Sequence, residues 1–148
     1  KKTPTGFSLP NVQWVEEKDW PKHEFDSSSA MKAVCGGKKP QGENSEQYEE
    51  WDFYLNADNI HLLNELKVSS SSDKLDPKIL KERYKIAMVF FALSIIDYKS
   101  KKNKDKGDME MSAVENEIQT TTACVSSVVL PIIESLGDED ELSQFETE

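Results

Sequence analysis

The sequence predicts an α+β fold, in which a small antiparallel sheet from the N-terminal half packs on an antiparallel pair of long C-terminal helices. Residues 1–75 contain short runs of strand-forming residues separated by polar loops, whereas residues 76–137 contain two long segments with helical spacing of apolar residues. Strands first and helices last are typical of a sheet that helices cover on one face. The 148 residues have the length of one domain, so we expect residues 1–137 to form it and residues 138–148 to form an acidic tail.

Three strands and a short helix are expected in the N-terminal half. The third strand has the clearest pattern, because Trp51, Phe53 and Leu55 alternate with polar residues and therefore share one face. Gly36 and Gly37 follow the second strand, and we interpret them as the start of a turn or flexible connection. The expected boundaries are residues 12–15, 30–35 and 49–56 for the strands, 59–68 for the short helix and 69–72 for a serine linker.

The first long helix is expected to begin at Asp76 and Pro77. Asp is a preferred N-cap, and Pro at the first helical position has no backbone N–H to lose. Residues 84–98 follow with only three polar side chains. A helix that is apolar almost all round must be covered on more than one side. We therefore expect one side to face the sheet and another to face the second helix, with Phe90 in the core.

The second long helix is expected to begin at a capping box formed by Ser112 and Glu115, and Pro131 is expected to kink it. Gly137 is a candidate for the residue that ends it. The apolar stripe that should face the core advances in steps of three and four residues. Its members are Val114, Ile118, Thr121, Val125, Val128, Ile132 and Leu136, and Cys124, Val129 and Ile133 widen it.

The chain is acidic, with a formal net charge of -10. That charge argues against nucleic-acid binding, because contacts to a phosphate backbone depend on Lys and Arg. The one basic cluster, at residues 99–106, is interpreted as a solvated loop between the two long helices. Residues 36–47, 99–108 and 138–148 are expected to be mobile, because they are polar and carry almost no apolar side chains.

The sequence also bears on the cellular setting. We find no signal peptide and no membrane span, since the apolar run of the first long helix is shorter than the roughly 20 residues that a bilayer requires. Cys35 and Cys124 lie far apart, so we expect reduced thiols in a cytoplasmic protein. The chain begins with Lys instead of Met, and we expect it to be a piece of a longer protein.

No catalytic, cofactor-binding or metal-binding residues are predicted, and no cofactor is expected. His23 and His61 lack metal-ligand spacing. Cys35, His61 and Asp58 are the residue types of a thiolate nucleophile, its base and an orienting carboxylate, so an enzyme or enzyme half-site using Cys35 and His61 is the alternative function. A nucleic-acid-associated module using the basic cluster at residues 99–106 is the third.

Five segments of the chain, taken together, are similar to a known family. They are residues 7–15 (FSLPNVQWV), 25–34 (FDSSSAMKAV), 54–63 (YLNADNIHLL), 83–93 (RYKIAMVFFAL) and 128–137 (VVLPIIESLG). Their order resembles the region that follows the ATPase module in large bacterial histidine-kinase-like ATP-binding proteins. The resemblance implies an appended domain that does not itself bind ATP, since the asparagine-bearing and glycine-rich nucleotide motifs of that ATPase fold are absent from this chain.

These observations together favour a non-enzymatic interaction or assembly domain, as an accessory part of a larger bacterial protein. The expected partner is another protein or a second copy of the chain, with no membrane. The expected interface is the part of the first long helix that its neighbours leave bare. Its candidate residues are Phe91, Leu93, Ile95 and Ile96.

Overall fold

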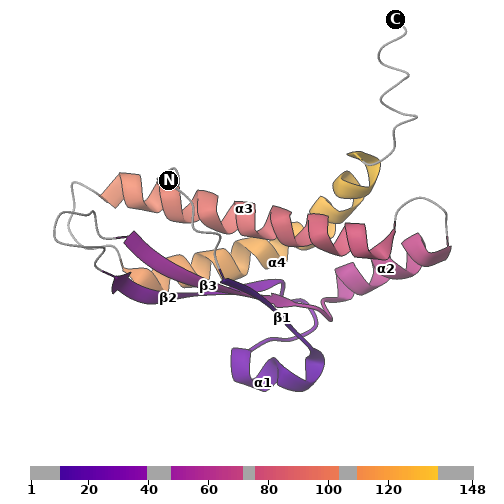
Figure 1. Cartoon of the computed structure of the whole chain (residues 1–148), viewed down its shortest axis with the longest axis horizontal. Coiled ribbons are helices and arrows are strands. Elements are labelled where there is room, and N and C mark those ends of the chain that lie inside the picture. Colours follow the sequence, from indigo (N-terminus) through magenta and orange to yellow (C-terminus); the bar gives the residue numbers. More distant parts are fainter. Residues whose placement is uncertain (1–10, 40–47, 72–75, 104–109, 137–148) are drawn as a thin grey trace, which may run out of the picture.

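The computed structural model confirms the α+β class (Figure 1). It describes residues 11–39, 48–71, 76–103 and 110–136. A three-stranded sheet built from the N-terminal half is covered by the long helices α3 (Pro77–Asn103) and α4 (Met111–Leu136). The expected acidic tail at residues 138–148 and the helix end at Gly137 lie outside the described residues.

The sheet is mixed, so the prediction of an antiparallel sheet is wrong for its first strand. β1 (Asn11–Val15) and β2 (Met31–Lys39) are the two edges, and β3 (Tyr48–Asn56) lies between them. β3 pairs antiparallel with β2 and parallel with β1. The segment between β1 and β2 holds the short helices η1 (Glu17–Asp19) and α1 (Trp20–His23). It places β2 at the far edge of the sheet and leaves the position beside β1 open. β3 then fills that position, between β1 and β2.

Gly36 and Gly37 lie within β2, where a turn had been expected. The pairing with β3 shifts register between Cys35, which opposes Trp51, and Lys38, which opposes Glu49. This shift is a β-bulge, an irregularity that glycine within a strand often marks. The strand therefore continues past the glycines and ends at Lys39.

The backbone N–H of Cys35 donates to a carboxylate oxygen of Glu115 on α4, at 3.0 Å. The predicted capping box is therefore wrong, because Glu115 points to the edge strand of the sheet. At the start of α4 the carbonyl oxygen of Glu110 accepts the backbone N–H groups of Ala113 and Val114 instead.

The short helix α2 (Ile60–Ser71) is longer than expected. Asn59 caps it, since its side-chain oxygen accepts the backbone N–H groups of His61 and Leu62 at 2.9 and 3.1 Å. The helix continues through Ser69, which is buried. The serine linker expected at residues 69–72 is thus wrong over the residues that the structure describes.

Helices α3 and α4 are antiparallel, as expected (Figure 1). Asp76 caps α3 as predicted, because its carboxylate accepts the backbone N–H of Lys78 at 2.9 Å. Near the other end of α3, Lys99 forms an ion pair with Glu117 of α4 at 2.9 Å. Lys99 lies within α3, and so do Lys101 and Lys102, where the sequence had predicted a loop. Residues 104–109 lie outside the described part of the chain.

The buried face of α4 differs from the predicted stripe in its second half. Thr122 and Ser126 are buried, whereas Val128 and Ile132 are 60% and 51% exposed. The buried hydroxyls donate to backbone carbonyls of their own helix, Thr122 to Ile118 at 2.7 Å and Ser126 to Ala123 at 2.9 Å. Thr122 and Ser126 can therefore face the interior, because their hydroxyls are hydrogen-bonded there. Val128 and Ile132 then lie on the exposed side of the helix. Among the side chains of α4 that the structure describes, the buried row is Val114, Ile118, Thr122, Ser126, Leu130 and Ile133. The side chain of Leu136, the last member of the predicted stripe, lies outside that description.

One core joins the sheet to the helices. Trp51, Phe53 and Leu55 of β3 all point into it, as their alternation predicted. On α3, Tyr84 is buried and stacks on Trp14 of β1 at 6.5 Å between ring centroids. Burial raises the pKa of the Tyr84 phenol, because the low-dielectric core disfavours its charged form. Among the described helices, none has both the length and the apolar content to span a bilayer.

Candidate functional site

The structure does not bring the three candidate catalytic residues together. Cys35 opposes Trp51, four pairs along the ladder from the pairing of Met31 with Leu55. Four residues of strand span about 13 Å. Asp58 and His61 follow the end of β3 that lies beyond Leu55, so they lie past one end of the ladder, whereas Cys35 lies near its middle. Within the described residues, no group of His, Cys, Asp and Glu could hold a metal ion.

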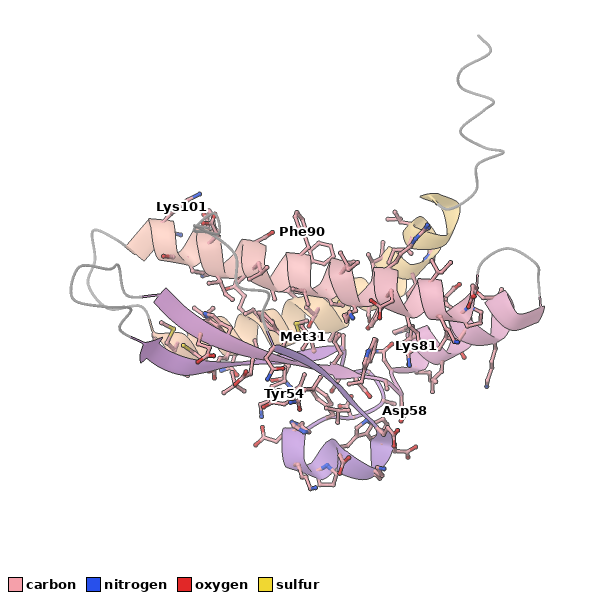
Figure 2. All side chains as sticks on the ribbon, in the orientation of Figure 1. Met31, Tyr54, Asp58, Lys81, Phe90 and Lys101 are labelled. Carbon is pink, nitrogen blue, oxygen red and sulfur yellow. The ribbon has the colours of Figure 1, made fainter. Side chains whose placement is uncertain are left out.

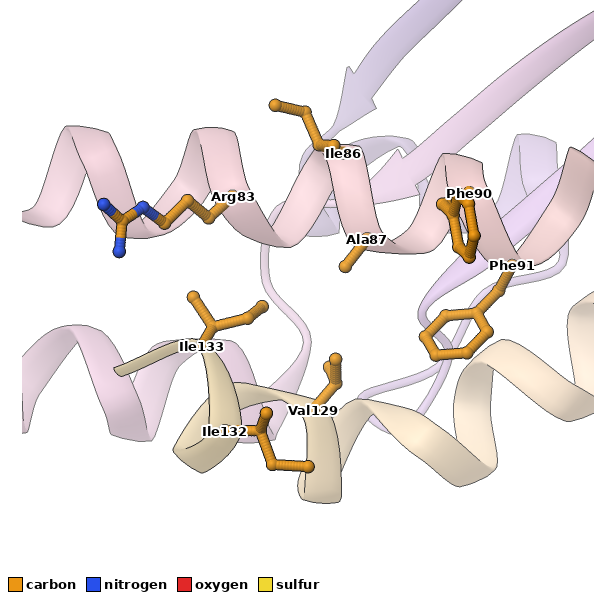
Figure 3. Close-up of a pocket in the computed structure, with 8 residues that line it drawn as sticks. All are labelled: Arg83, Ile86, Ala87, Phe90, Phe91, Val129, Ile132 and Ile133. Atoms are coloured by element: carbon orange, nitrogen blue, oxygen red, sulfur yellow. The ribbon is translucent and has the colours of Figure 1, made fainter. Parts of the chain in front are cut away.

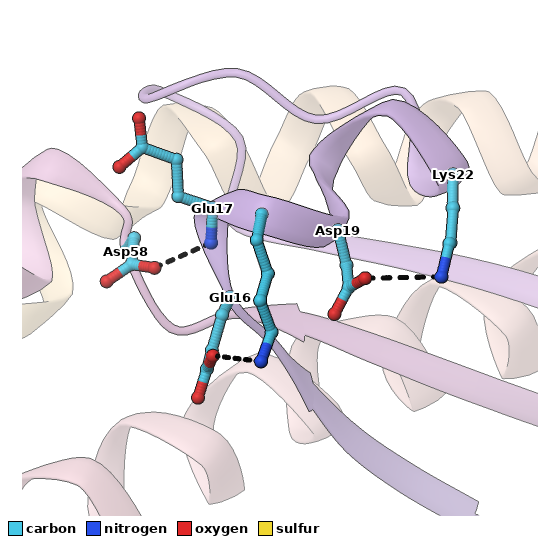
Figure 4. A network of polar contacts seen from close by, with 6 residues as sticks. Glu16, Glu17, Asp19, Lys22 and Asp58 are labelled. Atoms are coloured by element: carbon cyan, nitrogen blue, oxygen red, sulfur yellow. Dashed lines mark hydrogen bonds and ion pairs between the residues drawn. The ribbon is translucent and has the colours of Figure 1, made fainter.

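Asp58 has a structural role at the end of the sheet (Figure 4). Its carboxylate accepts the backbone N–H of Glu17 at 2.7 Å and so ties the loop after β3 to the loop after β1. Next to it, Lys22 pairs with Asp19 at 3.3 Å on the protein surface. Surface pairs of this kind contribute little to stability, and nothing in their arrangement forms a cleft for a substrate.

The buried side chain of Asn56 joins the loops at this end of the sheet. The side-chain amide of Asn56 donates to the carbonyl oxygens of Asp26 and Ser29 at 2.9 and 2.8 Å. Its oxygen accepts the indole N–H of Trp20 at 2.8 Å and the backbone N–H of Asp58 at 3.0 Å. Both polar atoms of Asn56 are thus fully used inside the protein, which is typical of a structural residue and leaves nothing for a ligand.

Asp26 gives this region a pH dependence. Its carboxylate accepts hydrogen bonds from the Ser28 hydroxyl at 2.6 Å and from the backbone N–H groups of Ser28 and Ser29. These bonds, the one from the Ser28 hydroxyl first, favour the charged form and lower the pKa of Asp26 below its ordinary value. A lowered pKa in the folded state stabilises the fold above the unfolded pKa of roughly 4, and that contribution is lost as the pH falls through the folded pKa.

Asp26→Asn should therefore destabilise the protein more at neutral pH than in acid. We expect the difference in unfolding free energy between the natural chain and the variant to shrink as the pH falls below about 4. Urea unfolding at several pH values measures it. Asp97→Asn is the matched control, because Asp97 forms an exposed pair with Lys101. An Asp26→Asn difference that stays constant with pH would contradict this assignment.

The strongest candidate site is an apolar groove between the first half of α3 and the second half of α4 (Figure 3). Its volume is about 500 Å³. α3 contributes one wall and α4 the other, and Arg83 is the one charged residue among those that line it. The lining residues are Arg83, Ile86, Ala87, Phe90, Phe91, Val129, Ile132 and Ile133.

Two rows of large apolar side chains stand exposed beside this groove. On α3, Ile86 and Phe90 are 64% and 67% exposed, and on α4 Val128 and Ile132 are exposed to a similar degree. We call these four residues the apolar patch. Figure 2 shows Phe90 on the side of α3 that points away from the sheet. The expectation that Phe90 lies in the core is therefore wrong.

Neither helix carries a charged side chain across the patch. In α3 the uncharged stretch is residues 86–96, and in α4 it is residues 118–133. Because the helices are antiparallel, the first half of α3 lies beside the second half of α4, so Ile86 and Phe90 line the groove from one side and Ile132 from the other. Large apolar patches on a protein surface mark interaction sites more often than single exposed residues do.

The predicted interface residues overlap this site only in part. Phe91 lines the groove. Leu93, Ile95 and Ile96 are half-buried and pack against the core. The sequence carried a signal for the residues that were missed, since α3 is apolar on more sides than the sheet and α4 can cover. The side left bare includes Ile86 and Phe90, one turn of helix apart.

No family model, curated protein or solved structure matches this chain. The resemblance to the region following the ATPase module of histidine-kinase-like proteins stays a prediction from the sequence. The candidate site is therefore argued from its own geometry.

Proposed function

We propose that this chain is a non-enzymatic interaction domain that binds another protein through the groove and the apolar patch. The observation that carries the proposal is the uncharged, exposed surface shared by α3 and α4, with Phe90 at its centre. Leaving such a surface in water is unfavourable, at roughly 25 cal/mol per Å² of apolar area, so covering it with a partner stabilises the complex.

The composition of the groove favours a protein partner over a small substrate. Sites for small molecules combine an apolar lining with several convergent polar groups that fix the orientation of the ligand. Among the described residues that line it, Arg83 is the only charged one, and the other seven are apolar. A groove between two helices suits the apolar face of a helix, which presents side chains at i, i+3, i+4 and i+7.

The wider setting is also part of the proposal. We propose a cytoplasmic protein in which this domain is an accessory part of a larger bacterial chain. The resemblance described above supports the second statement. The two free cysteines, Cys35 and the exposed Cys124, support a reducing compartment.

Phe90→Asp tests the proposed function directly. A displayed library of amphipathic helical peptides is selected on the natural chain alone, and the affinity of each enriched peptide is then measured for the natural chain and for the Phe90→Asp variant. We expect enriched peptides with apolar residues at helical spacing, and at least about a tenfold loss of their affinity for the variant, because a charge would be desolvated at the interface.

Two controls separate binding from folding and from the alternative function. Because Phe90 is exposed, circular dichroism of Phe90→Asp should match that of the natural chain. Cys35→Ser should leave peptide binding unchanged, since Cys35 lies on the sheet. If every selected peptide bound the natural chain and Phe90→Asp equally, the proposed function would be wrong.

A further inference from the structure

The apolar patch has the form of a surface that can pack on itself. Ile86 and Phe90 form a ridge on α3, and Val128 and Ile132 form a second ridge on α4, each with a spacing of four residues. The groove lies between the two helices, and the small side chain of Ala87 is among those that line it. One face of the molecule therefore holds both ridges and a groove.

We propose that the occupant of this groove is a second copy of the chain, related to the first by a two-fold axis. This inference rests on the proposed function and names its partner. A two-fold interface uses the same surface on both copies, so that surface must be complementary to itself. Here the α3 ridge of each copy enters the groove of the other, and the two helix pairs form a four-helix arrangement.

The exposed area fits this arrangement. The four patch residues are between 51% and 67% exposed. If a large apolar side chain offers about 150–250 Å², they expose on the order of 500 Å². A stable interface buries about 800 Å² on each partner, so the patch supplies the larger share. Its groove-lining neighbours Ala87, Phe91 and Val129 are only partly exposed and add a smaller area, so the interface would be of the small size that is typical of weak, reversible association.

The distribution of charge also permits a second copy to approach. Two chains of formal charge -10 repel each other in general. Within the patch, however, residues 86–96 and 118–133 carry no charge on either copy. The closest contact between two copies would therefore be made where like charges are absent.

Sedimentation velocity over micromolar to millimolar concentrations tests the proposal on the whole chain. We expect the average mass to rise toward twice that of the monomer. Phe90→Asp and Ile132→Asp should each weaken the dimer at least about tenfold, because each places two charges in the interface. Ile60→Asp is the matched control, since Ile60 is 46% exposed but lies on α2, and it should leave the dimer unchanged.

A second measurement reports on geometry without disturbing the patch. Cys124 is exposed and lies one turn before Val128 on α4. In Cys35→Ser it is the single cysteine, so a spin label there should show a dipolar coupling between copies. Phe90→Ser should abolish that coupling, and it serves as the second variant if Phe90→Asp fails to fold.

The outcomes distinguish this inference from the proposed function. A chain that stays monomeric at millimolar concentration overturns the dimer, as does a dimer that neither Phe90→Asp nor Ile132→Asp weakens. If peptides still bind the monomeric chain and lose affinity for Phe90→Asp, the interaction domain stands and its partner is a different protein. If neither peptides nor a second copy bind, both proposals fail.

Discussion

Replacing Ile118 with alanine is expected to lower the free energy of unfolding by about 2–5 kcal/mol, as large-to-small changes in a packed core do. Ile118 is fully buried in the core that joins α4 to the sheet and to α3. The loss combines the transfer free energy of the removed methyl and methylene groups with the cost of the cavity they leave. Urea denaturation followed by circular dichroism measures it.

Phe90→Ala is the contrasting change, although the side chain it removes is larger. Phe90 is 67% exposed, so its removal should cost less than about 1 kcal/mol, within the range of surface substitutions. The comparison is made at a concentration at which the chain is monomeric. Equal losses at Ile118 and Phe90 would show that the face of α3 carrying Phe90 is covered within the monomer.

The second large effect is expected for Asn56→Ala, at about 2–4 kcal/mol. The change leaves the indole N–H of Trp20 and the backbone N–H of Asp58 without their acceptor. It also removes a donor from the carbonyl oxygens of Asp26 and Ser29. An unsatisfied buried polar group costs roughly 1–3 kcal/mol. Here two half-buried N–H groups lose their acceptor together, while the Ser29 carbonyl oxygen keeps its hydrogen bond from Asn59.

Asn11→Ala is the matched control for this prediction. Asn11 also donates from its side-chain amide, to the carboxylate of Asp52 at 3.3 Å, but it is exposed at the start of β1. We expect a change within about 0.5 kcal/mol, because water replaces the lost partner. A loss at Asn56 no larger than the loss at Asn11 would mean that the loops at this end of the sheet are held by other contacts.

Local patterns predicted the elements better than they predicted how the elements meet. The alternation of Trp51, Phe53 and Leu55 identified the central strand and its buried face, and Asp76 identified the start of α3. The parallel pairing of β1 with β3 could not be predicted, because strand order depends on contacts between segments far apart in the chain. The extension of β2 through Gly36 also depends on its pairing with β3.

The candidate site was predicted in kind but only partly in its residues. Because α3 is apolar on almost every side, the sequence indicated that one side would remain uncovered. Phe91, one of the predicted interface residues, does line the groove. Which residues are exposed depends on the rotation of each helix about its axis. On α4 the rotation places Thr122 and Ser126 in the interior, and their hydroxyls donate to backbone carbonyls of their own helix. A prediction based on the spacing of apolar residues places Thr122 and Ser126 on the surface. It therefore predicts that Val128 and Ile132 face the core.

The contact between Glu115 and Cys35 has a consequence for how copies of this chain can join. β2 is an edge strand, and an edge strand offers unpaired backbone groups to strands of other molecules. On that edge the backbone N–H of Cys35 already donates to the Glu115 carboxylate. The bulge just beyond Cys35 also breaks the regular spacing of backbone N–H and C=O groups that an incoming strand would need. Growth of an open-ended ladder from β2 is therefore obstructed. The dimer proposed above would, in contrast, end at two copies, because each copy would cover the surface that the other could offer to a third.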